Sequence, residues 1–452
     1  MTLLNELSAE VCQRARISRD PRFDGRFFVA VKTTGIFCRP ICPANLPKEE
    51  NVEYFSSQAL AVSAGYRPCL RCRPESAPHS WAWKGAETTF LRALTLIEQG
   101  ELDGSLETLA SRLGISDRYL RQLFQRHLGM PPKQYAQIQQ LMFAKQLLHT
   151  SQISITEVAY ASGFQSTRRF NDAFQKLFRL TPTQVRRERA ALPSRNHLSL
   201  AFRGPFDWAH MLDFYRLRAI EGMELVDEQS YQRHFVLGEG TGWFKASMAQ
   251  SHLDIEFEME RLSDLRHLVA RLRRMFDLDA DLISIEAHLE QVAPGLVRRT
   301  GIRIPGVWNA WEAGVRAVLG QQVSVKAAIG QLNLLVSTLA ASEGSTRYFP
   351  TPEQVQMSDL SFLRMPERRK ETLKRLADYV RLHPMDSPMA WLSLSGIGPW
   401  TVDYAQLRGE SRSHCFLTGD LIVKKALAKF PQLTAESVAP WGSYATFHCW
   451  SH

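Results

Sequence analysis

Two closely spaced pairs of cysteines constrain the N-terminal part of the chain more than any other feature of its sequence. Three residues separate Cys38 from Cys42, and two separate Cys69 from Cys72. Two such pairs, joined by a moderate loop, provide the four thiolates of a tetrahedral zinc site. No signal peptide precedes them, so we expect the chain to stay in a reducing cytoplasm, where paired cysteines bind metal rather than form disulfides. The sequence therefore predicts one Zn²⁺ held by four cysteines.

The overall composition favours a partner that carries negative charge. The 452 residues include 55 lysines and arginines against 46 acidic residues, which gives a formal net charge of +9. That balance fits a polyanion such as nucleic acid. No apolar run approaches the ~20 residues of a membrane span, so we expect no membrane association. The three cysteines outside the two pairs are expected to be buried packing residues: Cys12, Cys415 and Cys449.

The middle of the chain contains an internal repeat. Residues 106–124 (LETLASRLGISDRYLRQLF) recur as residues 155–174 (ITEVAYASGFQSTRRFNDAF). In each copy a small alanine lets two helices approach, and a glycine, Gly114 or Gly163, takes the turn conformation that other residues resist. The repeat therefore predicts two helix-turn-helix units, with a plain helical bundle as the alternative.

This part of the chain resembles the AraC-type DNA-binding domain, including its closing FQKLFRLTPTQVRR at 174–187, although that family usually has glycine where Arg179 stands. The resemblance implies that the second helix of each unit enters a major groove of DNA. Each arginine on those helices can contact either a base or a phosphate, and the sequence leaves that choice open. The side chains expected to be exposed there are Asp117, Arg118, Arg121, Gln122, Ser166, Thr167, Arg168 and Arg169.

The cysteine region closely resembles the metal-binding N-terminal domain of the Ada family, through TTGIFCRPICPA at 33–44 and GYRPCLRC at 65–72. The resemblance implies that all four cysteines bind zinc and that Cys38 removes a methyl group from a DNA phosphotriester. Nearby arginines would hold DNA phosphates. The arginines in question are Arg39, Arg67, Arg71 and Arg73.

A physical argument supports methyl transfer to Cys38. Zinc keeps the thiol deprotonated at neutral pH, so attack on a methyl carbon needs no separate base. Methylation would also remove one negative charge from the site. At about 8 Å from a phosphate, and with an effective dielectric constant near 20, this relieves roughly 2 kcal/mol of repulsion and strengthens DNA binding about thirtyfold. The alternative is a zinc ion with a purely structural role.

The C-terminal part contains a glycine hairpin followed by an acidic residue. Gly396 and Gly398 precede Pro399, a residue typical of a helix start, and FLTGD ends at Asp420. These features resemble the helix-hairpin-helix DNA glycosylases, most closely the 3-methyladenine DNA glycosylase II (AlkA) group, over about residues 205–450. The resemblance implies a small antiparallel sheet domain followed by helical lobes.

The same resemblance assigns roles to individual residues. Asp420 would be the catalytic carboxylate, although an aspartate at this place is also typical of a helix N-cap. Trp400, Tyr404 and Trp450 would form an electron-rich pocket for a cationic base flipped out of the duplex, or else simply an aromatic core. Gln322 would be the wedge inserted into the DNA, where a leucine also occurs in the family. No lysine stands between the hairpin and Asp420, which predicts hydrolysis without a covalent intermediate.

The sequence thus predicts a multidomain α+β protein. Its four parts would be a zinc-bound methyl-acceptor domain (1–78), an all-α domain with two helix-turn-helix units (84–190), a sheet domain (198–285) and a helix-hairpin-helix glycosylase domain (286–452). Residues 73–80 and 191–199 would be connecting segments.

The predicted function combines regulation of alkylation-response genes with DNA repair. The expected partners are alkylated and promoter duplex DNA, with RNA polymerase as a further candidate. The expected state is a monomer at the bacterial nucleoid in the cytoplasm. The competing prediction is a transcription regulator whose glycosylase part is an inactive DNA-binding scaffold.

Overall fold

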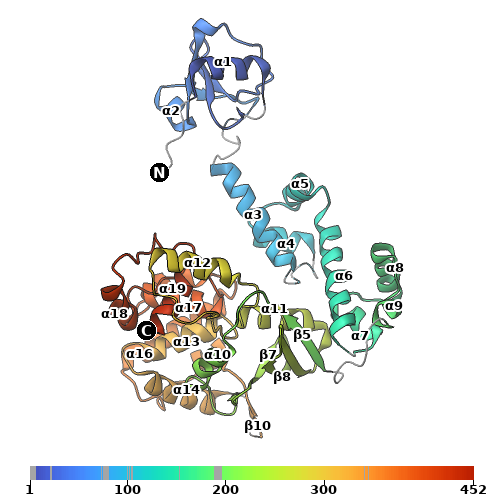
Figure 1. Ribbon diagram of the computed structural model, residues 1–452, viewed down its shortest axis with the longest axis vertical. Coiled ribbons are helices and arrows are strands. Elements are labelled where there is room, and N and C mark those ends of the chain that lie inside the picture. Colours follow the sequence, from blue (N-terminus) through green and yellow to red (C-terminus); the bar gives the residue numbers. More distant parts are fainter. Residues whose placement is uncertain are drawn as a thin grey trace. The chain divides into compact units, whose positions relative to one another are not determined.

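The computed structural model divides into two compact units, residues 1–139 and 140–452 (Figure 1). It describes residues 7–20, 23–72, 74, 81–98, 100, 102, 105–151, 153–187, 196–340, 342–344 and 346–451. The boundary between the two units falls inside one helix, α6 (Pro132–Thr150). The four domain boundaries expected from the sequence stay a prediction.

The first unit begins with a small four-stranded sheet covered on both faces. Its strand order is β3-β1-β2-β4, and only the β2–β4 pair is parallel. Successive residues of β1 alternate between two apolar clusters: Val29 packs with Cys12 of α1, and Ala30 packs with Ala61 of α2. The elements are α1 (Ala9–Ser18), β1 (Phe28–Val31), β2 (Ile36–Cys38), η2 (Glu49–Asn51), β3 (Val52–Phe55), α2 (Gln58–Ser63) and β4 (Arg67–Pro68).

The helices that follow confirm the predicted helix-turn-helix repeat. In the first copy Gly114 has φ +68° between α4 and α5, and in the second Gly163 has φ +85° between α7 and α8. A serine N-cap starts each second helix. The helices are α3 (Trp81–Glu98), α4 (Leu106–Arg112), α5 (Asp117–Leu128), α7 (Ile155–Ala161), α8 (Thr167–Phe178) and α9 (Pro182–Arg187).

A five-stranded antiparallel sheet opens the rest of the second unit, as predicted. Its order is β5-β9-β8-β7-β6, with helix α10 inserted in the chain between β5 and β6. The first strand begins at His197, so the predicted connecting segment 191–199 is wrong in its last three residues, which belong to β5. Residues 191–195 of that segment, and most of the other predicted connecting segment, 73–80, lie outside the described residues. The elements are β5 (His197–Ala201), α10 (Trp208–Arg216), β6 (Glu224–Val226), β7 (Ser230–Leu237), β8 (Gly240–Met248) and β9 (His252–Met259).

The helical region is organised around α13 (Ala310–Gly320), where every residue from Trp311 to Leu319 is buried. Gly314 lets the ring of Trp391 approach, because a β-carbon there would lie 2.8 Å from that ring. The other elements are η4 (Leu262–Asp264), α11 (Leu265–Met275), α12 (Leu282–Val292), α14 (Val325–Leu339), β10 (Ser342–Glu343), β11 (Thr346–Arg347), α15 (Pro352–Met357), α16 (Glu367–Leu382), η5 (Pro388–Ser393), α17 (Pro399–Gly409), α18 (Leu421–Lys429) and α19 (Gly442–Trp450).

Among the residues that the structure describes, no helix combines the length and apolar character that a membrane span needs.

Candidate functional site

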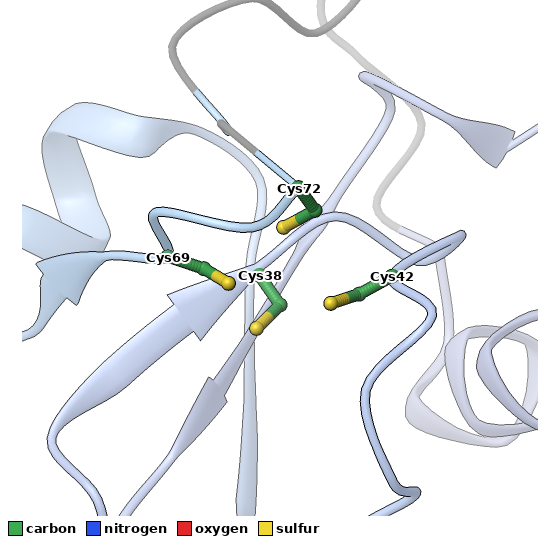
Figure 2. Close-up of side chains that lie close together, drawn as sticks. All are labelled: Cys38, Cys42, Cys69 and Cys72. Atoms are coloured by element: carbon green, nitrogen blue, oxygen red, sulfur yellow. The ribbon is translucent and has the colours of Figure 1, made fainter.

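The four predicted ligands lie together at one edge of the first sheet (Figure 2). Parallel pairing aligns Ile36 of β2 with Arg67 of β4, and the Cys69 N–H donates to the Phe37 carbonyl at 3.0 Å. The end of each strand therefore delivers the first cysteine of its pair to the same place. All four Sγ atoms lie within 4.8 Å of one another and face a common centre.

The donor set of this cluster fits a zinc ion. Zinc bonds of about 2.3 Å place tetrahedral sulfurs about 3.8 Å apart, which is within the observed spread. A hydrogen bond to Cys72 and, as a smaller cause, burial raise the pKa of Cys38. The same hydrogen bond lowers the pKa of Cys72 to about 6. Neighbouring thiols share protons in this way unless a cation balances their charge. Cys42 is buried, whereas Cys38, Cys69 and Cys72 are all partly exposed, so exposure excludes only Cys42 as the cysteine that meets a partner.

The arginines near the cysteines differ in their contacts. Arg39 forms an ion pair with the buried Asp24 and donates to the Cys72 carbonyl at 3.3 Å, and its backbone N–H donates to the Cys72 Sγ at 3.4 Å. Arg67 and Arg71 are exposed, whereas Arg73 lies outside the described residues. The contacts of Arg39 thus hold it within the cysteine site, whereas the side chains of Arg67 and Arg71 are exposed and available to DNA phosphates. Their DNA contacts stay a prediction.

The arginines predicted on the second helix of each helix-turn-helix unit are all exposed. Arg118 and Arg121 lie on α5, where Arg121 approaches Asp117 at 3.6 Å, and Arg168 and Arg169 lie on the first turn of α8. The buried faces of both helices are apolar, with Leu120 and Phe170 at equivalent places. The opposite faces are therefore the ones that carry the charge.

The glycine hairpin lies between η5 and α17. Gly396 has φ +92°, and a β-carbon there would overlap the side chain of the buried Thr372. Gly398 has an ordinary φ of −112° and is the N-cap of α17, with open space where a β-carbon would be. The start of α17 thus carries the positive end of a helix dipole and no side chain above it, an arrangement suited to a phosphate.

Asp420 is both a helix N-cap and part of the wall of a pocket. Its Oδ1 accepts three hydrogen bonds: 2.8 Å from Ile422 N, 3.2 Å from Val423 N and 3.1 Å from the indole Nε1 of Trp450. Its Oδ2 receives none from the described residues. The carboxylate is therefore fixed in orientation while one oxygen stays available to a ligand.

The pocket beside Asp420 has a volume of about 500 Å³ and includes all three predicted aromatic residues. The Trp400 and Tyr404 rings stack with centroids 5.4 Å apart. The Trp450 ring lies parallel to that of Phe214, with centroids 6.3 Å apart. A flat aromatic ligand fits such walls. The expected role of these residues in binding a base stays a prediction.

Sequence reasoning missed the contribution of α10 and the arginines around it. Phe214 lies on α10 and Arg218 just beyond its end, and both line the pocket together with Arg316. Burial by itself would raise the pKa of Tyr404, but the guanidinium groups of Arg408, Arg218 and Arg316 outweigh it and lower that pKa. The pocket thus has cationic as well as aromatic walls. Phe214 and Arg218 are four residues apart, a local spacing that could have been noticed, although α10 itself ends at Arg216.

The predicted wedge, Gln322, is exposed between α13 and α14 and has φ +57°, which is unusual for a residue other than glycine. The preceding Gln321 connects this turn to the hairpin. Its side-chain amide donates to the Gly396 carbonyl at 3.2 Å and to the Thr401 hydroxyl at 3.1 Å. Wedge and hairpin are therefore joined by one side chain that sequence reasoning had not singled out.

Comparison with known families identifies three segments of the chain. Residues 11–75 match the metal binding domain of Ada, residues 109–188 match a helix-turn-helix domain, and residues 197–309 match the AlkA N-terminal domain. These matches cover the cysteine cluster, the five-stranded sheet and both helix-turn-helix units except the first residues of α4. The resemblances found in the sequence are confirmed.

Curated relatives show the same combination. The chain is 34% identical over 475 residues to the "Probable bifunctional transcriptional activator/DNA repair enzyme AlkA" of Mycobacterium tuberculosis, covering 98% of this chain and 96% of that protein. It is 33% identical to "DNA-3-methyladenine glycosylase 2" of Escherichia coli, over 56% of this chain and 96% of that protein. It is 35% identical to "Bifunctional transcriptional activator/DNA repair enzyme Ada" of Escherichia coli, over 38% of this chain and 47% of that protein. Because the first match spans nearly all of both proteins, the chain belongs to the family of bifunctional transcriptional activator and DNA repair proteins that join Ada-type and AlkA-type parts.

Proposed function

We propose that this protein repairs alkylated DNA by two separate reactions and regulates the genes of that response. Its C-terminal part excises alkylated bases such as 3-methyladenine by hydrolysing the N-glycosidic bond. Its N-terminal part accepts methyl groups from DNA phosphotriesters onto a cysteine of its zinc site, one per molecule. The observation that carries the glycosylase proposal is the oriented carboxylate of Asp420 inside an aromatic pocket.

In the proposed excision, a DNA phosphate binds at the start of α17 and the damaged nucleotide turns out of the duplex into the pocket. Gln322 occupies the space that the base leaves. As the glycosidic bond breaks, its electron pair departs with the base, and the Oδ2 atom of Asp420 stabilises the positive charge on the sugar. A water oxygen then bonds to the sugar carbon, and its proton passes to the carboxylate. The segment 396–420 contains no lysine, so water rather than an amine is the proposed nucleophile.

In the proposed methyl transfer, the Cys38 sulfur attacks the methyl carbon of a phosphotriester. The carbon–oxygen bond breaks, and its electrons stay on the phosphate oxygen, so the products are a thioether and a phosphodiester anion. Zinc, when bound, supplies the positive charge that keeps the thiols deprotonated at neutral pH. The remaining ligands would be Cys42, Cys69 and Cys72, and the exposed Arg67 and Arg71 would bind flanking phosphates.

The regulatory part of the proposal depends on the two helix-turn-helix units. Their exposed arginines suit promoter DNA, and loss of one negative charge at the cysteine site on methylation would strengthen DNA binding nearby. Contact with RNA polymerase, a monomeric state and a place at the nucleoid in the cytoplasm are the further parts of this proposal.

The replacement Asp420→Asn tests the glycosylase proposal against the inactive-scaffold alternative. Asparagine keeps the helix N-cap but removes the charge, so release of methylated purines from alkylated duplex DNA should fall about 100-fold or more. The measurement is single-turnover base release. The control is Asp281→Asn, which changes the N-cap of α12 away from the pocket. Undiminished release by the Asp420 variant would show that this carboxylate does not take part in the reaction.

Mass spectrometry of the zinc-loaded protein tests the methyl-acceptor proposal against a structural zinc site. After incubation with DNA containing methyl phosphotriesters, the peptide with Cys38 should gain one methyl group in place of a proton. The Cys38→Ser variant should gain none. Unmodified Cys38 in a protein that retains its zinc would leave the metal with a structural role only.

A further inference from the structure

The guanidinium group of Arg218 occupies a particular place in the pocket wall. Its central carbon lies 3.7 Å from the centroid of the Phe214 ring, and its Nη1 donates to the Phe214 carbonyl at 3.2 Å. The backbone carbonyl of Arg218 in turn accepts from Arg316 at 2.9 Å. The stacking on Phe214 and the hydrogen bond from Nη1 hold the side chain of Arg218 against the cavity, and the bond from Arg316 fixes its backbone.

The charge of Arg218 is not balanced by a carboxylate among the described residues, unlike that of the other pocket arginines. Arg299 pairs with Asp207 at 2.6 Å, and Arg316 lies between Glu224 and Glu312 at 3.0 and 2.9 Å. Asp213, an acidic residue that also lines the pocket, forms an ion pair with Arg216. Burial lowers the pKa of Arg218 only to about 10, so it stays charged at neutral pH. Arg218 is therefore the cation that a ligand would meet.

A second group in the pocket also has a proton to donate. The Tyr404 hydroxyl accepts from Arg408 Nη1 at 2.8 Å, which leaves its own O–H free to donate. The three guanidinium groups that lower the pKa of Tyr404 make this O–H a stronger donor. On the acceptor side, the Oδ1 atom of Asp420 is already used by Trp450 and the backbone. Arg218 and Tyr404 thus offer two donors in this part of the cavity, and the Oδ2 atom of Asp420 remains available as an acceptor.

Resting on the glycosylase function proposed above, we propose that Arg218 is a specificity-determining residue that donates a hydrogen bond to a carbonyl oxygen of the flipped base. A guanidinium group has N–H donors and no acceptor, so it matches an exocyclic carbonyl and is mismatched to an exocyclic amine. The pocket then favours carbonyl-bearing purines relative to purines that lack this oxygen.

The test compares two neutral bases that differ at the carbonyl position. One duplex carries hypoxanthine, and a second carries unsubstituted purine at the same place. Arg218→Met keeps the length of the side chain but removes its donors and charge. It should lower the single-turnover rate of hypoxanthine release about 10- to 100-fold, because a lost hydrogen bond to a charged donor costs about this much. Release of purine should change less than about threefold.

Two control variants separate recognition from support of the pocket. Arg261→Met removes an exposed arginine just after β9 that does not line the cavity, and it should leave both rates unchanged. Arg218→Lys keeps the charge and some donors, and should recover part of the hypoxanthine rate. Thermal unfolding of each variant reports whether it is folded.

The possible outcomes distinguish this inference from the proposed function. Equal losses on both duplexes, or no loss of hypoxanthine release, would overturn the role of Arg218 while leaving the glycosylase function standing. Wild-type protein that releases methylated purines but no hypoxanthine would also overturn it. Wild-type protein that releases no base from any duplex, including methylated DNA, would remove the proposed function itself.

Discussion

The two glycines of the hairpin are explained by different physical reasons. Gly396 needs to be glycine for the fold, because its backbone has φ +92° and Thr372 fills the space beside it. Gly398 has neither constraint, since its backbone is ordinary and the space around it is open. The protein alone does not explain a glycine at 398, whereas a phosphate approaching the start of α17 does.

Alanine at each position should separate these roles. Gly398→Ala is expected to leave the melting temperature nearly unchanged and to weaken binding of duplex DNA several-fold. Gly396→Ala should lower the free energy of unfolding by more than about 1 kcal/mol, because it adds both backbone strain and a steric overlap. Thermal melts and DNA titrations of both variants measure this difference. Loss of stability in Gly398→Ala would show that its role is structural.

At the scale of elements, the two helix-turn-helix copies end their second helices in the same way with different residues. Gly129 ends α5 with φ +66°, and Arg179 ends α8 with φ +59°. Both occupy the left-handed conformation of a helix C-cap, which glycine adopts freely and arginine only at a cost. Arg179, which stands where the AraC-type pattern has glycine, therefore keeps the left-handed backbone conformation that glycine has at the end of α5.

The sequence predicted elements whose signal is local and missed those that depend on contacts between distant segments. The repeat, the cysteine pairs and Pro399 at a helix start are local patterns, and each was confirmed as structure. The sheet domain was expected from residue 198, one residue after β5 begins, but the expected connecting segment 191–199 overlapped this strand, whose partner β9 lies more than fifty residues away. Gln321 was missed because its contacts join segments that only the fold brings together.

One loop residue gives the second unit a dependence on pH. Asp277 follows α11, is buried, and accepts hydrogen bonds from Ile304 N at 3.2 Å and from the Tyr444 hydroxyl at 3.0 Å. Burial is the main cause that raises the pKa of Asp277 to about 7. Between pH 4 and 7 the folded state thus binds more protons at this site than the unfolded state does. Its contribution to stability is complete below about pH 4 and is lost as the pH rises through 7.

Replacing Asp277 with asparagine should remove this dependence, because the amide cannot ionise and still offers an acceptor. The free energy of unfolding of Asp277→Asn, relative to wild type, should increase from pH 4 to about pH 7.5 and then become constant. Urea unfolding at several pH values, followed by tryptophan fluorescence, measures the difference. A difference that does not vary with pH would show that Asp277 is ionised in both states.

On the scale of the whole molecule, the cysteine cluster and the aromatic pocket belong to different compact units. Each unit has apolar clusters of its own, and the sheet beside the cysteines is small, with only two residues in β4. Small sheets with few buried residues depend on a metal more than large cores do. The two proposed reactions should therefore differ in their sensitivity to loss of zinc.

Removing zinc from the full-length protein with a chelator should destabilise the N-terminal sheet and abolish methyl acceptance by Cys38. Release of methylated bases should stay within about twofold of the untreated rate, because no cysteine of the cluster lines the pocket. Proteolysis patterns and base-release rates, measured before and after zinc is restored, provide the readouts. A parallel loss of base release that zinc restores would show that the pocket depends on the metal.

The double role of Asp420 affects how variants of this family can be interpreted. The side chain starts α18 as well as facing the cavity, so a protein that had abandoned repair would still benefit from a capping residue there. Asparagine and serine meet that need as well as aspartate does. Among related chains, asparagine or serine at this position would indicate a protein that kept the fold but lost base excision. Only a carboxylate at this position would indicate that the excision reaction is retained.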